Sequence, residues 1–371
     1  MPANAQQTAL LIANNPFVPI LLLWILAWVI MLFGGNALIR GLKSLKGMKW
    51  SPREDTPDSH LQKAGTPSMG GLGILGSATL SWIASLTLLL TLLYSAHGPI
   101  GFSGWDWVAF HLFLGCVLAH GVLGFADDWS KARGKGGLTS KAKLFGQIVL
   151  ALLFIFVVQQ SLILRSTPAK LDDEYLAFGP FIGLLCFLLI IGTSNAVNLT
   201  DGIDGLAAGL SVQVGLVFAF LALETFGTAE VGLFATSVEL TWVALGGACL
   251  GFLAFNKHPA KVFMGDTSSL ALGAALGAGA ILTRSVFLLP FIGFMFYIEM
   301  FSVMSQVAYF KYTRKKTGEG KRLFRRAPLH HHFELAGWSE WRVVVTFWGI
   351  NALTTVIGLV LWKIGILRHF P

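Results

Sequence analysis

The chain has 371 residues, of which 54% are hydrophobic and only 12% are charged, and its mean hydropathy is +0.68. This composition excludes a soluble globular protein and is typical of a protein that crosses the membrane several times. The formal net charge of +8 would suit nucleic acid or anionic lipid, but the sequence contains no extended soluble nucleic-acid module. We therefore expect an all-α polytopic membrane protein, a single integral membrane domain over residues 1–371, with no nucleic acid as partner.

Ten apolar segments are candidate membrane spans, because about 20 apolar residues are needed to cross a bilayer core. They occupy residues 17–38, 70–94, 107–126, 144–163, 180–197, 206–223, 241–256, 268–283, 286–311 and 343–364. None alternates as a barrel strand does, so closed helices are expected. The first segment has no basic region ahead of it, which favours a membrane span over a cleaved signal. Residues 170–180 predict a short hairpin on the outer side.

The basic residues are distributed unevenly along this pattern. Of the 27 lysines and arginines, 22 fall in the loops that follow the odd-numbered segments, if Lys311 at the end of the ninth segment is counted with its loop. By the positive-inside rule, these loops lie in the cytoplasm and both termini lie outside. The positive charge is therefore mainly a topological signal, and the basic residues after the first segment suit anionic membrane lipid.

Four polar side chains follow the fifth apolar segment at steps of three: Asn195, Asn198, Asp201 and Asp204. On a helix this spacing places them in one stripe. A polar helix end that meets water would explain a single aspartate. A carboxyl group at the end of a membrane-length segment is expensive, however, and four polar groups in register favour a functional site.

Two further motifs follow odd-numbered segments. Asp127 and Asp128 close the third segment, and Lys143 begins the fourth, so that its ammonium can point back toward the aspartates. Adjacent side chains on a helix point about 100° apart, so both carboxylates can face one small site only where the helix ends. A solvated interfacial pair is the alternative. In residues 63–71, glycine, proline and hydroxyl groups, including Ser68, surround Lys63 and can present N–H groups to phosphate.

The loops after the seventh and ninth segments carry the remaining candidates. Asn256, Phe263 and Asp266 follow the seventh segment, and Phe263 is either a stacking platform for a base or an interfacial anchor. Gln306 shares a helical face with Glu299 in the ninth segment. Three consecutive histidines over 330–332 fit one zinc ion poorly, because successive side chains fan around a helix. The aspartates favour Mg²⁺, with the histidines as donors to phosphate or sugar.

All of these loops fall on the predicted cytoplasmic face, although the topology was derived from lysine and arginine alone. The residues gathered there are Lys63, Asp127, Asp128, Lys143, Asp201, Asp204, Asp266 and His330. Carboxylates, lysines and glycine turns at one membrane face indicate a site for a magnesium-bound diphosphate.

With these residues assembled, the chain resembles the polyprenyl-phosphate N-acetylhexosamine-1-phosphate transferases. The resemblance rests on five motifs that cover nearly the whole chain. They are Lys63-Ala-Gly-Thr-Pro-Ser-Met-Gly-Gly, Asp127-Asp128, Asn195-Ala-Val-Asn-Leu-Thr-Asp-Gly-Ile-Asp-Gly-Leu, Val262-Phe-Met-Gly-Asp266 and Pro328-Leu-His-His-His-Phe-Glu334. The triple-histidine motif favours the muramoyl-pentapeptide branch of that family. Ser68 stands where that branch often has threonine, and a hydroxyl is retained.

The resemblance implies ten transmembrane helices in the bacterial cytoplasmic membrane, an active site that faces the cytoplasm, and often a homodimer. It implies that UDP-MurNAc-pentapeptide and undecaprenyl phosphate give lipid I and UMP in peptidoglycan synthesis, with Mg²⁺ as cofactor. For the catalytic groups, it implies that Asp266 binds Mg²⁺, with Asp201 as a second candidate ligand. It also implies that Asp127 engages the lipid phosphate, with support from Asp128, and His330 is the fourth candidate catalytic residue.

Substrate-binding roles follow from the same resemblance. The residues implied around the uridine are Asn198, Asp201, Asn256 and Phe263. Those implied around the phosphates and nucleoside are Lys63, Lys143 and Gln306, and His330 and His331 are implied to contact the diphosphate or sugar. Ser68 and Asp204 are further candidates for substrate binding. Two other functions stay open. One is a sister enzyme that moves GlcNAc-1-phosphate to a polyprenyl carrier, and the other is a cation-coupled transporter, whose acids usually lie near the midplane.

Overall fold

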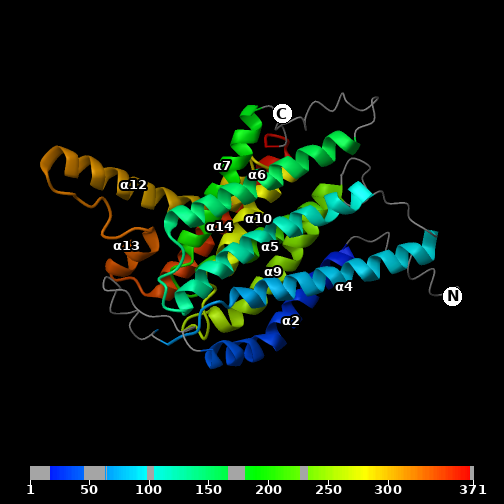
Figure 1. The fold of residues 1–371 in the computed structure, drawn as a ribbon, viewed down its shortest axis with the longest axis horizontal. Helices are drawn as coiled ribbons and strands as arrows, with labels where there is room; N and C mark the ends of the chain where they lie inside the picture. The colour runs from blue at the N-terminus through cyan, green and yellow to red at the C-terminus, as the bar shows by residue number, and fades with distance from the viewer. Residues whose placement is uncertain are drawn as a thin grey trace.

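The computed structural model describes residues 17–45, 63, 65–97, 104–165, 180–225 and 233–367, and within these ranges it is helical with no strand (Figure 1). The longer helices are α2 (Phe17–Ser44), α4 (Gly71–His97), α5 (Gly104–Ala132), α6 (Ser140–Arg165), α7 (Pro180–Thr200), α8 (Leu206–Thr225), α9 (Leu233–Asn256), α10 (Asp266–Leu282), α12 (Phe294–Thr317) and α14 (Glu340–Lys363). Two short helices, α11 (Leu289–Ile292) and α13 (Leu329–Leu335), complete the described fold.

The prediction of an all-α polytopic membrane protein is confirmed. Eight of the described helices are long and apolar enough to cross a membrane. The eighth predicted segment forms α10, which at 17 residues is shorter than the others. The hairpin predicted over 170–180 lies almost wholly outside the described residues.

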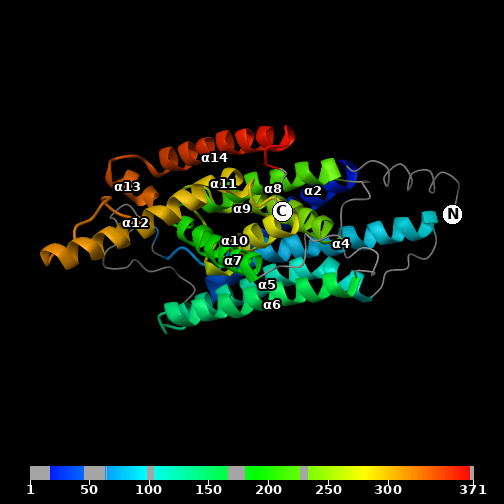
Figure 2. The ribbon, with the colours of Figure 1, turned by 90° about the horizontal axis from the view of Figure 1, so that it is seen from above.

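The ninth predicted segment, residues 286–311, differs from expectation because it is not one helix. The short helix α11 ends at Ile292, and after Gly293 the helix α12 begins at Phe294 and continues to Thr317. Figures 1 and 2 show α12 extending beyond the end of the bundle, with α13 on the chain that returns from it. Gln306 fastens this return, because its Oε1 accepts hydrogen bonds from Leu323 N and Phe324 N, each at 2.9 Å.

Helix α10 is the centre of the bundle. Seen from above, α14 lies on one side of it and α6 on the opposite side (Figure 2), and residues 267–280 of α10 are all buried. Helices in lipid gain little from hydrophobic association, so small residues that allow close approach are favoured. Gly273 and Gly277 serve this purpose, since a Cβ atom at either would overlap Thr193 of α7.

Helix α5 meets α10 just as closely, at the first residue of α10. A Cβ atom on Gly124 would overlap the backbone carbonyl of Asp266. Only glycine therefore allows α5 to lie against this turn. The contact matters for the site, because Asp127 and Asp128 follow one turn later on α5.

We expect the change Gly124→Ala to lower the free energy of unfolding by about 1–3 kcal/mol, as overpacking of a tight interior does. We also expect it to reduce activity, because Asp266 must shift. The matched control is Gly115→Ala on the same helix, where a Cβ atom meets no described atom within 4 Å. Thermal unfolding in detergent checks both, and equal midpoints for the two variants would contradict this account of the helix contact.

Candidate active site

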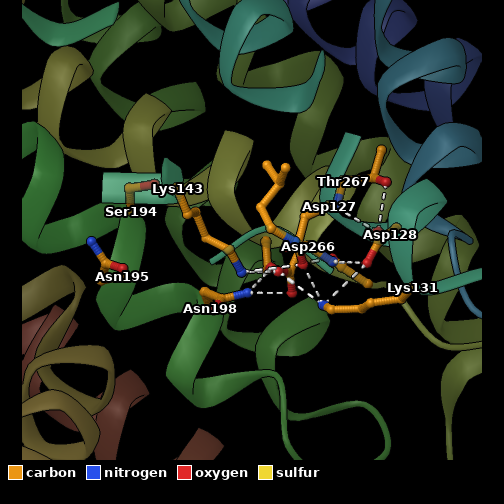
Figure 3. Close-up of polar contacts among 12 residues, drawn as sticks. Asp127, Asp128, Lys131, Lys143, Ser194, Asn195, Asn198, Asp266 and Thr267 are labelled. Atoms are coloured by element: carbon orange, nitrogen blue, oxygen red, sulfur yellow. Dashed lines mark hydrogen bonds and ion pairs between the residues drawn. The ribbon is translucent and has the colours of Figure 1, made fainter. Parts of the chain in front are cut away.

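Three of the predicted aspartates and the predicted Lys143 meet at one end of the bundle, where Asp127, Asp128 and Asp266 form an acidic centre with Lys143 and Lys131 (Figure 3). The side chains come from the C-terminal turns of α5 and from the first residues of α6 and α10. These ends coincide because successive helices run in opposite directions. The sequence prediction that Lys143 points back toward Asp127 is confirmed, with Nζ 3.2 Å from Oδ2.

Asp127 forms ion pairs with both lysines, although its side chain is only 1% exposed. Its Oδ2 lies 2.5 Å from Lys131 Nζ, one helical turn further along α5. Its Oδ1 accepts a hydrogen bond of 2.8 Å from Leu138 N, in the loop that leads to α6. A buried carboxylate needs such partners, because desolvation otherwise makes its charged form very costly.

Asp128 has a different partner, the N-terminus of α10. Gly265 stands at the N-cap with φ 76°, a conformation that favours glycine, and glycine has no side chain with which to cap the helix. Asp128 supplies the missing acceptor: its oxygens accept from Asp266 N (3.2 Å), Thr267 N (2.9 Å) and Thr267 Oγ1 (2.7 Å). Both adjacent aspartates are thus used without an end to α5, because their partners come from different directions.

Asp266 is held at both of its oxygens. Asn198 Nδ2 donates to Oδ1 at 2.9 Å and also to Ser269 Oγ at 2.8 Å. Oδ2 is contacted by Lys143 Nζ and by Lys131 Nζ, the latter at 3.1 Å. Two ammonium groups and one amide therefore fix this carboxylate at the first turn of α10 (Figure 3).

The donor set suits a hard divalent cation. Oxygen atoms of Asp127, Asp128 and Asp266 lie within 4.8 Å of one another, and carboxylate oxygens are the ligands that Mg²⁺ prefers. Three carboxylates face two lysines, so one negative charge is left over. Because Asp128 is committed to the helix end, Asp127 and Asp266 are the groups with oxygens to offer an ion.

Asp201, the other predicted metal ligand, is not one of these three carboxylates. It lies in the turn between α7 and α8, where its side chain accepts a hydrogen bond from the Gly265 backbone. Burial, followed by repulsion from Asp266 and Asp128, raises the pKa of the Asp201 carboxyl to about 8. The structure therefore groups Asp266 with its α5 partners, and Asp201 borders the acidic centre.

A second polar cluster, here called the Lys63 cluster, contains Lys63, Asp204, His258 and Glu340. Lys63 Nζ lies 2.8 Å from Asp204 Oδ1 and 2.6 Å from Glu340 Oε1. His258 Nδ1 lies 3.1 Å from Asp204 Oδ2 and 3.2 Å from Glu340 Oε2. Two carboxylates thus share a lysine and a histidine, and Glu340 also accepts from Asp204 N at 2.6 Å.

Asn256 joins the Lys63 cluster to the loop before α10. Its Oδ1 accepts from Gly205 N at 3.0 Å, and its Nδ2 donates to Val262 O at 3.0 Å. Gly205 has φ 83° and ends the turn that carries Asp201 and Asp204. Both the oxygen and the nitrogen of the Asn256 amide are therefore used within the protein.

The predicted glycine-rich segment lies against the same loop. Phe263 N donates to Pro67 O at 2.9 Å, and Gly70 N donates to Phe263 O at 2.8 Å. Ser68 lies against Gly265, at which a Cβ atom would be 3.0 Å from Ser68 Oγ. The backbone of Phe263 is thus paired, and its ring is half-buried. This pairing holds the segment that begins at Lys63 against the loop before α10.

His330 and His331, which were predicted to donate to phosphate or sugar, both make contacts within the protein. His330 is fully buried, its Nδ1 lies 3.1 Å from Glu299 Oε1, and its Nε2 faces Gly202 in the turn after α7. His331 Nδ1 lies 2.8 Å from Glu334 Oε2. The triple-histidine motif thus joins α12, α13 and the turn that carries Asp201.

Comparison with known proteins identifies the family. Residues 110–284 match the family described as glycosyl transferase family 4. The chain is 44% identical to the phospho-N-acetylmuramoyl-pentapeptide-transferase of Geobacillus sp. over 90% of its length and 95% of the relative's. It is 43% identical to that of Halalkalibacterium halodurans over 92% and 97%, and 44% identical to that of Geobacillus thermodenitrificans over 83% and 87%. The chain belongs to the phospho-N-acetylmuramoyl-pentapeptide-transferase family.

Four residues of this family member are prominent in the structure but were assigned no role from the sequence: Lys131, Thr267, His258 and Glu340. Lys131 had a usable signal, because it stands four residues after Asp127 on a helix. Thr267 directly follows Asp266. Glu340 and His258 had none, since only the fold brings the start of α14 to the loop after α9.

A pH-dependent stability is expected from His331. Burial lowers the pKa of its imidazole to about 4, against the opposing hydrogen bond to Glu334, while His330 and Arg326 lower it further. Between about pH 4 and the ordinary value near 6.5, the folded state therefore binds fewer protons than the unfolded state, so stability falls as pH falls through this window.

The change His331→Gln should remove this dependence. The variant therefore avoids the loss of about 2 kcal/mol in the free energy of unfolding that the parent suffers at pH 5. The measurement is the shift of the thermal midpoint between pH 7.5 and pH 5 in detergent. His111→Gln, at an exposed position of α5, is the matched control. A shift in the His331→Gln protein as large as that of the parent would disprove the burial effect.

Proposed function

We propose that the protein transfers phospho-MurNAc-pentapeptide from UDP-MurNAc-pentapeptide to undecaprenyl phosphate, which yields lipid I and UMP for peptidoglycan synthesis. The family membership supports the reaction. The single structural observation that carries the proposal is the acidic centre, where Asp127 and Asp266 share two lysines beside the N-terminus of a helix. Phosphoryl transfer depends mainly on positioning and charge neutralisation, and this arrangement offers both.

Lys131 and Lys143 are the groups of this chain that would neutralise the diphosphate. Both ammonium groups already lie against Asp127 and Asp266. A phosphate oxygen that enters between them would exchange one carboxylate partner for another anion, at little cost in desolvation. The lysines can therefore follow the negative charge as it moves from the attacking oxygen of the lipid phosphate to the bridging oxygen, which leaves as part of UMP.

Asp127 would orient the lipid phosphate. A phosphomonoester has a second pKa of about 6, so the acceptor is largely dianionic at neutral pH and needs no strong base. The role of Asp127 is then to hold the attacking oxygen in line through the two lysines, and to take a proton when the monoanion reacts. Asp128 supports this arrangement by holding the N-terminus of α10.

Mg²⁺ would be held by Asp266 and Asp127, and it supplies charge neutralisation to the diphosphate when bound. Asn198 would keep Asp266 turned toward the ion through its contact with Oδ1. Asp201, at the border of the centre, faces the same negative charges and would gain from an added cation.

The Lys63 cluster suits the nucleotide end of the donor. It offers a lysine and two carboxylates, and Asn256 joins the turn after Asp204 to the loop that carries Phe263. Carboxylates can accept hydrogen bonds from ribose hydroxyls or from the uracil N–H, and the half-buried ring of Phe263 can stack on the base. Ser68, Gln306 and His331 would complete the surroundings of the diphosphate and sugar.

The membrane supplies the second substrate, and we propose a multi-pass protein of the bacterial cytoplasmic membrane whose acidic centre faces the cytoplasm. The distribution of lysine and arginine supports this orientation, and UDP-sugars are soluble molecules of the cytoplasm. A homodimer is part of the same proposal, on the basis of the family resemblance.

The decisive experiment measures UMP release by detergent-purified protein, given undecaprenyl phosphate and each UDP-sugar, with and without Mg²⁺. We expect Mg²⁺-dependent release with UDP-MurNAc-pentapeptide alone. Release with UDP-GlcNAc instead would assign the GlcNAc-1-phosphate reaction. Ion flux in proteoliposomes without any UMP release would overturn the proposal in favour of a cation-coupled transporter.

The role of the Lys63 cluster gives a separate prediction. In the Glu340→Gln protein Lys63 loses one of two charged partners, so we expect the KM for the UDP-sugar to rise about fivefold or more, with kcat little changed. Glu319→Gln, at an exposed position after α12, is the control. Steady-state kinetics with varied donor checks the prediction, and an unchanged KM with a lower kcat would contradict a nucleotide-side role.

A further inference from the structure

A buried polar chain lies one helical turn inside the acidic centre and has no part in the roles described so far. Gln147 of α6 is buried, its Nε2 donates to Ser194 Oγ at 3.1 Å, and its Oε1 accepts from Asn195 Nδ2 at 3.1 Å. Ser194 Oγ in turn donates to Leu270 O at 3.0 Å. One chain of hydrogen bonds therefore joins α6, α7 and α10.

This chain is in register with the residues that hold Asp266. Gln147 follows Lys143 by four residues on α6, and Ser194 precedes Asn198 by four residues on α7, so each pair shares a helical face. Lys143 contacts Oδ2 of Asp266 and Asn198 contacts Oδ1. The two layers are about 6 Å apart along the helices, since each residue rises about 1.5 Å.

Helix α6 packs closely on α5, where Gly146 meets Leu123, but no comparable glycine contact joins the described part of α6 to α7. Its outer face is exposed and apolar, through Leu144, Phe145, Val149, Leu152, Leu153 and Phe156. Lipid is as apolar as these side chains, so it provides no force that presses α6 onto α7. By contrast, α7 is fixed on α10 by the glycine contact at Gly273 as well as by Ser194.

We propose that Gln147 is a positioning residue for the transfer reaction. By joining α6 to α7 one turn inside the acidic centre, it holds Lys143 and Asn198 at the spacing that places each on its own oxygen of Asp266. Without it, α6 can move away from α7, and Lys143 leaves the carboxylates. The catalytic part of this inference rests on the proposed function, and the geometric part does not.

The test measures how fast Lys143 reacts with an N-hydroxysuccinimide acetate, by mass spectrometry of the detergent-purified, metal-free protein. In the Gln147→Leu protein we expect Lys143 to react about sevenfold faster, the change in population that corresponds to two interhelical hydrogen bonds of average strength in a membrane. Lys131 is the internal reference, because it lies on α5. Gln159→Leu makes the same chemical change further along α6 and should leave both rates unchanged.

Asn195→Ala removes one of the two hydrogen bonds of Gln147 and should accelerate Lys143 about threefold. The double variant should react no faster than Gln147→Leu alone, because that change already breaks the whole connection. An equal rise at Lys131, or an unchanged rate at Lys143 in both single variants, would overturn the proposal.

In the transfer assay, we expect Gln147→Leu to lower kcat by at most about sevenfold, because protein in which Lys143 has left the carboxylates is inactive. Unchanged kcat beside faster labelling would overturn the catalytic part alone. Because labelling needs neither substrate nor metal, a failure of the proposed function would leave that measurement intact.

Discussion

The site depends above all on the contact between Asp128 and the N-terminus of α10. The loop before α10 needs glycine at position 265, because the chain there has a positive φ, and that choice leaves the helix without a cap of its own. Backbone N–H groups at a buried helix end must find acceptors. Asp128 provides them from α5, and negative charge is favoured at a helix N-terminus. The same contact fixes Asp266, since its own N–H is one of the donors. The carboxylate of Asp128 therefore serves both the packing of α5 on α10 and the position of Asp266.

A consequence of this sharing is that the acidic centre has an uneven charge balance. Three carboxylates face two lysines, yet only two of the carboxylates are available to a ligand, since Asp128 serves the helix. The available part is therefore close to neutral, which lets it remain compact without substrate. A diphosphate and a lipid phosphate add far more negative charge than two lysines can balance, and a divalent cation would correct the deficit. The metal requirement that we propose thus rests on this count of charges in the proposed substrates rather than on the acids alone.

Much of this architecture could be predicted from the sequence, because membrane helices are governed by length and hydropathy. The predicted segments reappear as helices, and the positions of Asp127, Asp266 and Lys143 were expected to converge. The break at Gly293 was missed, since an apolar segment looks continuous whether or not the helix restarts within it. Partners such as Glu340 were also missed. They depend on which helix ends become neighbours, and periodicity along one helix contains no information about its neighbours.

The properties of a lipid environment also explain why hydrogen-bonded polar side chains are buried one helical turn inside the acidic centre. A water-soluble enzyme can hold its catalytic groups with a hydrophobic core, but in lipid apolar side chains do not distinguish a neighbouring helix from the solvent. Here small residues bring α7 and α5 onto α10, and buried hydrogen bonds hold α6 where no glycine contact with α7 fixes it. The polar chain at Gln147 is satisfied at every step, so its burial costs little. A reactive centre at the membrane face can therefore be ordered by groups that never meet substrate.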